Sequence, residues 1–199
     1  MSSDRRSRDD VVGAAGRLFA ERGYHGTSMR DLGKALGLQG SSLYSHIESK
    51  EALFVAVVER GAALFQAAAD RALAETEEPV ARLRALVRAH LDVILDHVDE
   101  SKTFLNEARV LGGDERDAVL AFRDGYEARF RETIAAATAA GGLDPATDVR
   151  IASIFILSLL NAVDRWYDPE GRLTREQLAD AVMGFVLSGL GARRGEGAG

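Results

Sequence analysis

Residues Thr27–Glu51 read TSMRDLGKALGLQGSSLYSHIESKE, and this stretch decides the fold. Ser28 stands three residues before Asp31, which is the spacing of a capping box and predicts that a helix begins here. Gly37 ends that helix, because glycine adopts the left-handed backbone conformation of a helix C-terminus at little cost. A tight turn then leads into a second short helix over residues 41–47. Two short helices joined in this way are typical of a helix-turn-helix.

The second helix of this stretch carries small, polar side chains on its outer face. Such a face fits a DNA major groove, which is about 12 Å wide and is read by hydrogen-bonding side chains. Tyr44 and His46 can reach phosphates, and Lys50 adds its charge to the free N–H groups at the start of the next helix. The alternative is a surface helical hairpin without a ligand. The candidate DNA contacts are Thr27, Ser28, Gln39, Gly40, Ser41, Ser42, Tyr44, Ser45, His46 and Lys50.

Helical patterns continue on both sides of this stretch, without the alternation typical of strands. Apolar spacing predicts a first helix over about 7–22, and Ser49 is expected to cap a long helix over about 50–75. Further helices are expected over about 79–98, 101–111, 115–140, 145–167 and 175–190. The fold class is therefore all-α, with about nine helices.

Two of the later helices have recognisable starts. Asp144 is expected to be the N-cap of the helix over 145–167, with Pro145 in the first turn, where proline is well tolerated. Thr174 and Gln177 form a second capping box, which predicts the start of the last helix. The tail, residues 191–199, is rich in glycine and charge, and we expect it to be disordered.

Composition narrows the class of protein. The 199 residues include no cysteine, which excludes disulfides, thiolate metal sites and cysteine nucleophiles. We find no paired carboxylates in a catalytic motif and no glycine loop that would cradle phosphate, so we expect no enzyme activity and no cofactor. His90 and His97 share a helix face, but no third metal ligand is evident. The longest strongly apolar run, residues 151–160, is too short to cross a bilayer, so we expect a soluble, cytoplasmic protein without a membrane partner.

The net charge of −6 is unevenly distributed along the chain. Residues 1–55 hold eight Lys/Arg and seven Asp/Glu, whereas the remaining residues hold seventeen and twenty-four. The acidic groups thus concentrate in the C-terminal part. This asymmetry is compatible with a small DNA-binding head on an acidic body.

Residues 8–54 resemble the DNA-binding domain of the tetracycline-repressor (TetR) family of bacterial transcription factors. The resemblance rests on the ordered motifs LFAE-x-GY-x-x-TS, DL-x-x-x-x-G and LY-x-H-x-x-SKE. Gln39 stands where the family usually has a serine N-cap, and Ile47 where phenylalanine is common. The resemblance implies a homodimeric helix-turn-helix repressor that binds double-stranded operator DNA. It also implies a DNA-binding domain over 1–54 and a helical ligand-binding and dimerisation domain over 55–190.

The stretch Ile151–Val163 is apolar nearly all round, so its helix is expected to be buried on most faces. In a protein with one core it would be the central helix. The last helix carries a second apolar set, and two such helices from each of two subunits would form a four-helix bundle at a two-fold axis. We favour the second interpretation, which the family resemblance also implies. The second apolar set is Leu178, Ala181, Val182, Phe185, Val186 and Leu190.

Polar groups on the otherwise apolar C-terminal helices suggest a small-molecule effector. An arginine can pair with phosphate and an indole can stack on adenine, which suits an acyl chain carried on coenzyme A. The segments FLNEARVL (104–111) and RWY (165–167) also resemble the branch of the family that responds to acyl-coenzyme A. The alternative is that Arg165 pairs with Glu107 or Asp164 while Trp166 fills a corner. The candidate ligand-binding residues are Phe104, Asn106, Arg109, Asn161, Arg165 and Trp166.

These observations predict a dimeric repressor that a small apolar effector, such as an acyl-coenzyme A thioester, releases from a palindromic operator. The alternative function is a helical adaptor that binds only protein and responds to neither DNA nor a metabolite.

Overall fold

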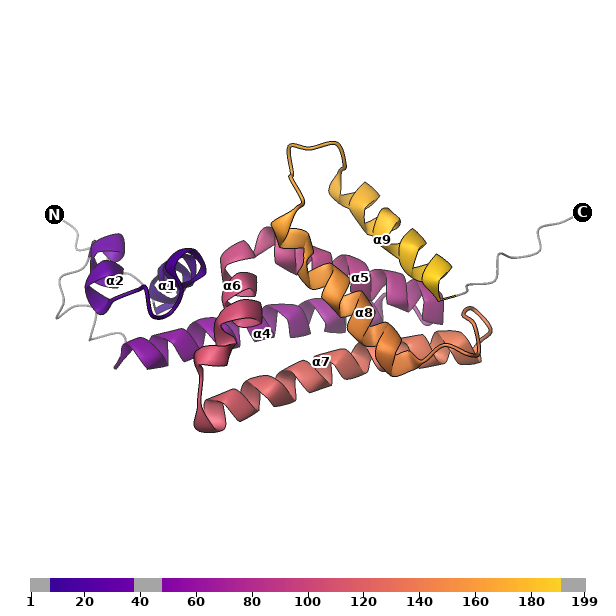
Figure 1. Cartoon of the computed structure of the whole chain (residues 1–199), viewed down its shortest axis with the longest axis horizontal. Coiled ribbons are helices and arrows are strands. Elements are labelled where there is room, and N and C mark those ends of the chain that lie inside the picture. The colour runs from indigo at the N-terminus through magenta and orange to yellow at the C-terminus, as the bar shows by residue number, and fades with distance from the viewer. Residues whose placement is uncertain (1–7, 38–47, 191–199) are drawn as a thin grey trace, which may run out of the picture. The chain divides into compact units, whose positions relative to one another are not determined.

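The computed structural model describes residues 8–37 and 48–190, and within these ranges the chain is helical and contains no strand. Figure 1 shows the arrangement of the helices along the chain. The α-helices are α1 (Arg8–Arg22), α2 (Met29–Leu36), α4 (Lys50–Ala74), α5 (Pro79–Asp96), α6 (Val98–Lys102), α7 (Gly113–Ala139), α8 (Val149–Asn161) and α9 (Arg175–Gly189). The all-α prediction is confirmed. The expected helix over 41–47 and the expected disordered tail lie outside the described residues.

The described chain forms two compact units. Unit 1 comprises residues up to Leu64 together with His97–Ala121, and unit 2 comprises Phe65–Asp96 together with the residues from Phe122 onward. The long helices α4 and α7 each contribute one part to unit 1 and one part to unit 2. The domain boundary predicted at residue 54 stays a prediction based on the extent of the DNA-binding motif.

Unit 1 begins with α1, which ends at Gly23 as the sequence predicts. Gly23 has a φ of 70°, a left-handed conformation that favours glycine. The inner face of α1 packs through Phe19, whose ring meets Phe54 of α4 edge-on at 5.2 Å between centroids. The capping box of α2 is present in full, and Gly37 (φ 65°) provides its left-handed C-cap. Both predictions from the deciding stretch are therefore confirmed.

A second contact inside unit 1 joins α4 to the segment 98–107. Gly61 of α4 lies so close to this segment that a Cβ atom at Gly61 would stand 2.8 Å from the Glu100 carbonyl oxygen and 2.8 Å from the Cβ of Phe104. The Thr103 hydroxyl donates a hydrogen bond to the Gly16 carbonyl oxygen of α1 at 3.4 Å. Glycine at position 61 thus allows two backbones to approach more closely than side chains would permit.

The expected single α-helix over 101–111 is wrong. The chain instead leaves α6 through a π-helical turn, η1 (Thr103–Glu107), and a 3₁₀ turn, η2 (Ala108–Val110). The close approach at Gly61 and the bond from Thr103 to α1 hold this segment by tertiary contacts. Such contacts override the local helical preference on which the sequence prediction relied.

The expected helix over 145–167 is also corrected at both ends. Asp144 caps only a turn, by accepting a hydrogen bond from the Ala146 N–H at 2.8 Å. Asp148, four residues on, is the true N-cap of α8 and accepts from the N–H groups of Arg150 and Ile151, each at 3.0 Å. The helix ends at Asn161, and a 3₁₀ turn, η3 (Val163–Arg165), follows it.

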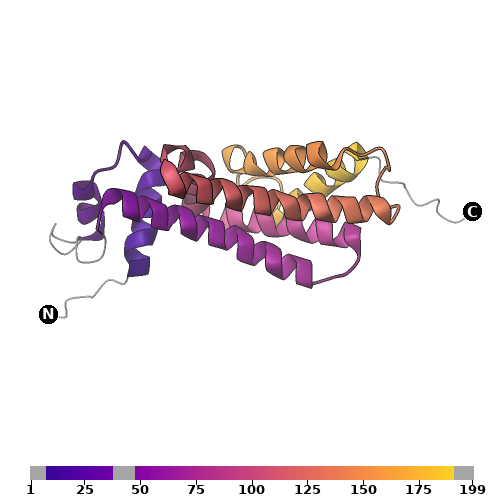
Figure 2. The same cartoon turned by 90° about the horizontal axis from the view of Figure 1, so that it is seen from below.

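Unit 2 is organised around α5, which contacts α8, η3 and α9. Figure 2 shows α4 turning back into α5 through a short connection. The capping box at Thr174 is present and opens α9 as predicted. Ion pairs join the helices at the surface of this unit, including Arg175 of α9 with Asp96 of α5 at 2.6 Å. The fully buried apolar side chains of α5 are Leu83, Leu86, Val87, Leu91 and Ile94.

Helix α4 is the single described helix that is long and apolar enough to cross a membrane, judged by length and composition only. Its mean hydropathy is 1.5 over an 18-residue window, and half of that window is buried inside the protein. A core helix gives the same signature, because a helix buried on several faces is apolar on all of them.

Candidate functional site

The start of α4 places a cation at a helix N-terminus. The Ser49 side chain caps this terminus by accepting a hydrogen bond from the Ala52 N–H at 3.0 Å. The Lys50 ammonium lies 4.0 Å from the centroid of the Tyr24 ring, a cation–π contact that holds it beside the terminus. Tyr24 in turn packs edge-on against Phe54, with 4.8 Å between the ring centroids. A fixed cation next to free backbone N–H groups forms an anion site that suits phosphate.

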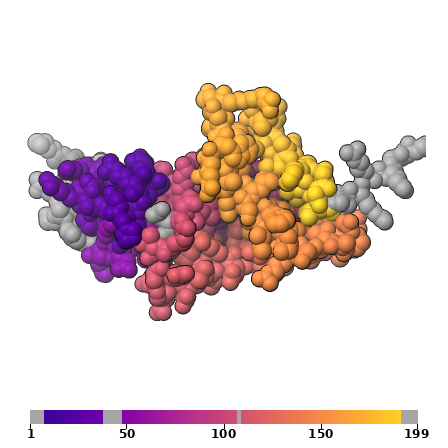
Figure 3. Space-filling model, viewed as in Figure 1, coloured from indigo at the N-terminus to yellow at the C-terminus, as the bar shows by residue number. Residues whose placement is uncertain are grey.

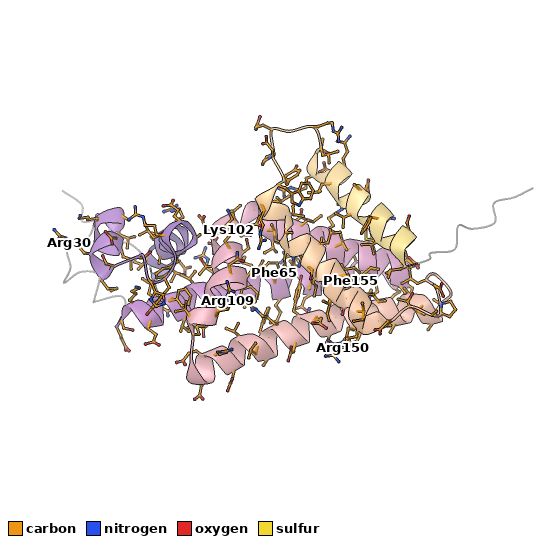
Figure 4. All side chains as sticks on the ribbon, in the orientation of Figure 1. Arg30, Phe65, Lys102, Arg109, Arg150 and Phe155 are labelled. Atoms are coloured by element: carbon orange, nitrogen blue, oxygen red, sulfur yellow. The ribbon has the colours of Figure 1, made fainter. Side chains whose placement is uncertain are left out.

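Sequence reasoning missed the role of Tyr24. It belongs to the motif GY that the sequence shares with the TetR family, but its contact with Lys50 joins residues 26 positions apart. The structure assigns Tyr24 a positioning role, because its ring fixes the ammonium group rather than offering a donor of its own. Arg30, labelled in Figure 4, is a further exposed cation on α2 that the sequence prediction did not include.

Thr27 and Ser28 lie at the start of α2. Thr27 is only 2% exposed, and its hydroxyl is shared between the carbonyl oxygens of Leu18 (3.2 Å) and Gly23 (2.9 Å), so it ties α1 to α2. Ser28 is exposed, and its hydroxyl hydrogen-bonds the Asp31 carboxylate. These bonds from Ser28 hold the pKa of Asp31 below its usual range. The other predicted contacts, Gln39–His46, lie outside the described residues.

Three of the predicted ligand-binding residues belong to unit 1. Phe104 is 3% exposed and packs against Gly61 of α4. Asn106 lies in the π-helical turn, and its carbonyl oxygen accepts a hydrogen bond from Arg109 Nε at 3.3 Å. These contacts hold the segment locally, and a ligand-binding role for the three residues stays a prediction.

The other three belong to unit 2 and follow one another at the end of α8. Arg165 is exposed, and among the described residues it forms no ion pair, including none with Asp164. Trp166 is 57% exposed and meets only the edge of Tyr167, with 6.5 Å between the ring centroids. An exposed indole beside an arginine without an ion pair is unlike the packed corner of the alternative interpretation. Such a pair is able to bind a ligand that carries a ring and a phosphate.

A buried polar chain leads from the core of unit 2 to Asn161. His90 of α5 is 2% exposed; its Nδ1 lies 3.1 Å from the Tyr126 hydroxyl and its Nε2 lies 3.1 Å from Asn161 Oδ1. The ring of Phe65 stands 4.9 Å from the imidazole. Burial lowers the pKa of His90 to about 4, partly opposed by the hydrogen bond with Asn161. The imidazole is therefore neutral at physiological pH. Sequence reasoning missed this chain, because its members lie 36 and 71 positions apart.

We expect this histidine to make the protein less stable in mild acid. The pKa of His90 in the folded state, about 4, lies below its unfolded value of 6.5, so the unfolded chain takes up the proton first. The free energy of unfolding should be full above pH 6.5 and fall towards pH 4, by about 3 kcal/mol from this one group. Urea unfolding at pH 7 and pH 4.5 checks this, with His90→Gln as the variant that keeps a donor for Asn161 but does not titrate. An equal loss of stability in both proteins would contradict the expectation.

One face of α8 and α9 presents large apolar side chains to solvent. Phe155, labelled in Figure 4, is 68% exposed, and Phe185 of α9 is 69% exposed. Figure 3 shows the two helices at the surface of unit 2, α8 in orange and α9 in yellow. Exposed apolar groups gathered in this way mark interaction surfaces. The face consists of Ile151, Ile154, Phe155 and Phe185, and we call it the α8–α9 face.

Two family models match the chain. The model described as "Bacterial regulatory proteins, tetR family" matches residues 11–57. The second, "Tetracyclin repressor-like, C-terminal domain", matches residues 76–190, more than half of the chain. The two matches fall on either side of the middle of α4 and together cover both predicted parts of the chain.

Individual relatives cover nearly the whole chain. The transcriptional repressor KstR2 of Mycobacterium tuberculosis is 29% identical over 185 residues, which is 92% of each protein. Among solved structures, AibR in complex with isovaleryl coenzyme A and operator DNA is 30% identical, with a TM-score of 0.84 over 90% of this chain and 97% of AibR. PfmR from Thermus thermophilus is 31% identical, with a TM-score of 0.81 over 92% of this chain and 99% of PfmR.

Proposed function

The chain belongs to the TetR family of bacterial transcriptional regulators, and from this premise we propose that it is a homodimeric repressor that leaves a palindromic operator when it binds a coenzyme A thioester. The observation that carries the DNA-binding half is the Lys50 ammonium held against Tyr24 at the N-terminus of α4. The effector half is supported by the exposed pair Arg165 and Trp166, and by the thioester in the AibR complex.

On DNA, each subunit places residues 39–46 in a major groove while Lys50 binds a phosphate at the groove's edge. A two-fold dimer requires a palindromic operator whose half-site centres lie about one helical turn, roughly 34–36 Å, or a multiple apart. Phosphate contacts fix the register of the protein, whereas the side chains in the groove read the sequence. Thr27 supports this arrangement from inside, by tying α2 to α1.

Lys50→Ala should weaken binding to operator and to random DNA alike, by about tenfold at moderate salt, because it removes one phosphate contact that carries no sequence information. The slope of log affinity against log salt should become shallower by about 0.9. Fluorescence anisotropy at several salt concentrations measures both quantities. Arg71→Ala, which removes an exposed positive charge from the other end of α4, is the matched control and should leave the slope unchanged. A Lys50 variant with the wild-type slope would place the phosphate contact elsewhere.

The α8–α9 face supports the homodimer. Unit 2 has its own buried core, so Phe155 and Phe185 are not needed to complete it. A two-fold interface uses the same patch of both subunits, and an apolar patch is complementary to itself. Two α8 and two α9 helices would then form the four-helix bundle that the sequence predicts.

The effector is proposed to be bound through Arg165 and Trp166 at the end of α8. The guanidinium would pair with a phosphate of the carrier, and the indole would stack on its adenine. The predicted ligand-binding residues of unit 1, Phe104, Asn106 and Arg109, belong to the proposal as the part of the chain through which unit 1 responds. Through Gly61 and Thr103 their segment contacts α4 and α1, the helices that support the DNA-binding motif.

Titration of the protein–operator complex tests the proposal as a whole. DNA from the region of the protein's own gene is bound first, and thioesters of short, branched and cyclic acids are then added, beside coenzyme A alone and the free acids. The proposal expects sequence-selective, salt-sensitive binding that one class of thioester reverses, with the response weakened in Arg165→Ala. Binding without sequence preference would overturn the repressor, and a complex that no thioester affects would overturn the effector.

A further inference from the structure

The buried polar chain in unit 2 has a direction, which follows from its chemistry. Asn161 Oδ1 is only an acceptor, so the His90 Nε2 at 3.1 Å must be the donor. In a neutral imidazole the other nitrogen is then the acceptor, and Tyr126 donates its hydroxyl hydrogen to His90 Nδ1. Both hydrogen bonds of the polar chain therefore point from Tyr126 through His90 to the oxygen of Asn161.

This direction fixes the orientation of the Asn161 amide. Because its oxygen faces His90, its nitrogen faces away, with two hydrogens available for another partner. Among the described residues the Asn161 amide nitrogen donates to no protein group, and its side chain is partly exposed, unlike those of His90 and Tyr126. The polar chain thus begins in the core and ends in an oriented donor at the surface of the unit.

The polar chain is also neutral throughout. Burial lowers the pKa of His90 to about 4 and raises the pKa of Tyr126 well above its usual value. The aromatic rings of Phe65 and Phe130 surround the imidazole, at 4.9 and 6.4 Å between centroids. A neutral donor beside an apolar aromatic core suits a neutral acceptor attached to an apolar group, such as an acyl carbonyl.

We propose that the Asn161 amide nitrogen donates a hydrogen bond to the thioester carbonyl oxygen of the effector, with His90 and Tyr126 as positioning residues that fix the amide's orientation. The inference rests on the proposed thioester effector. It divides the recognition between two parts of the same segment: Arg165 and Trp166 bind the coenzyme A carrier, and Asn161 reads the acyl junction one helical turn before them.

Thioether analogues test this inference, because they replace the carbonyl by CH₂ and keep the rest of the molecule. Isovaleryl, octanoyl and cyclohexanecarbonyl coenzyme A are compared with their S-alkyl counterparts by isothermal titration. For the tightest pair we expect the wild-type protein to bind the thioester about tenfold more tightly than the thioether, which is the effect of one well-placed hydrogen bond. The measurement on the wild type requires no substitution.

Variants then assign the preference to Asn161. Asn161→Ala and Asn161→Asp should bind thioester and thioether equally; the aspartate keeps an acceptor for His90, so it also serves as the variant closest in shape. Tyr126→Phe should reduce the preference at least twofold, since the imidazole loses the donor that fixes its tautomer. Arg165→Ala is the matched control and should weaken both ligands in parallel. Thermal unfolding of each variant, which a purely structural role would change without altering the preference, is measured alongside.

The outcomes separate this inference from the proposed function. A wild-type ratio near one, or a ratio that survives in both Asn161 variants, overturns the role of Asn161 while thioester-induced release of the operator still stands. Failure of every coenzyme A compound to bind overturns the thioester effector, and the role of Asn161 falls with it. A tenfold ratio that disappears in the Asn161 variants and persists in Arg165→Ala supports the assignment.

Discussion

Phe155→Asp is expected to convert the protein from a dimer into a monomer. Phe155 lies on the α8–α9 face with 68% of its side chain exposed, although other side chains of α8 are buried in unit 2. A two-fold interface would bury the introduced carboxylate twice, once in each subunit, without a partner of opposite charge. An unpaired buried charge is strongly unfavourable, so the dissociation constant of the dimer should rise more than 100-fold, roughly 3 kcal/mol or more.

Sedimentation velocity at micromolar concentration measures the change in mass, and operator binding should fall with it because a monomer reaches only one half-site. Phe185→Asp should behave in the same way. Ala136→Asp is the control, since it places the same charge at an exposed position of α7 away from this face. A folded Phe155→Asp protein that sediments as a dimer would show that the α8–α9 face is not the interface.

Gly61→Val is expected to have the largest effect on folding. The Cβ atom would lie 2.8 Å from a backbone oxygen and 2.8 Å from the Cβ of Phe104, and neither of these atoms is the end of a flexible side chain. The valine must push α4 away from the segment 98–107, and such overpacking costs about 2–3 kcal/mol. For a chain of this length the melting temperature should fall by roughly 5–10 °C. Operator affinity should fall as well, because the first half of α4 carries Lys50.

Gly125→Val is the matched control, because Gly125 is an exposed helical glycine with no atom within 4 Å of the position of a Cβ. The same substitution there should change the melting temperature by no more than a degree or two, in line with helix propensity alone. Calorimetry of the two variants and the wild type decides the matter. Equal effects at both positions would mean that the close approach at Gly61 is unimportant.

Local signals in the sequence predicted the fold well. The capping boxes at Ser28 and Thr174 are both present, because a cap is a set of hydrogen bonds within four residues and needs no tertiary partner. The same reasoning failed at Asp144. Two aspartates four residues apart both suit an N-cap, and the chain uses the second one, Asp148. The sequence alone contains no local signal that decides between them.

The candidate sites were harder to predict, since they depend on contacts between distant residues. The motif predicted Lys50, but its partner Tyr24 becomes visible only when α1 and α4 pack together. Asn161 was predicted from its spacing to Arg165 on one helix, whereas the His90 and Tyr126 side chains that orient it come from two other helices. The dimer face was predicted as a nearly uniform apolar helix. Only burial separates the exposed Phe155 from the buried Ile156 beside it.

The π-helical turn at Thr103–Glu107 has a consequence for how this segment tolerates changes of length. Its hydrogen bonds span one residue more than those of an α-helix, so removing one residue here would restore an ordinary helical turn. The helix itself would gain, yet every side chain after the deletion would be rotated by about 100° around the axis. Asn106 and Arg109 would then face a different side of the segment. A one-residue deletion would therefore preserve the backbone's regularity while scrambling its presentation, which makes the number of residues in this turn as important as their identity.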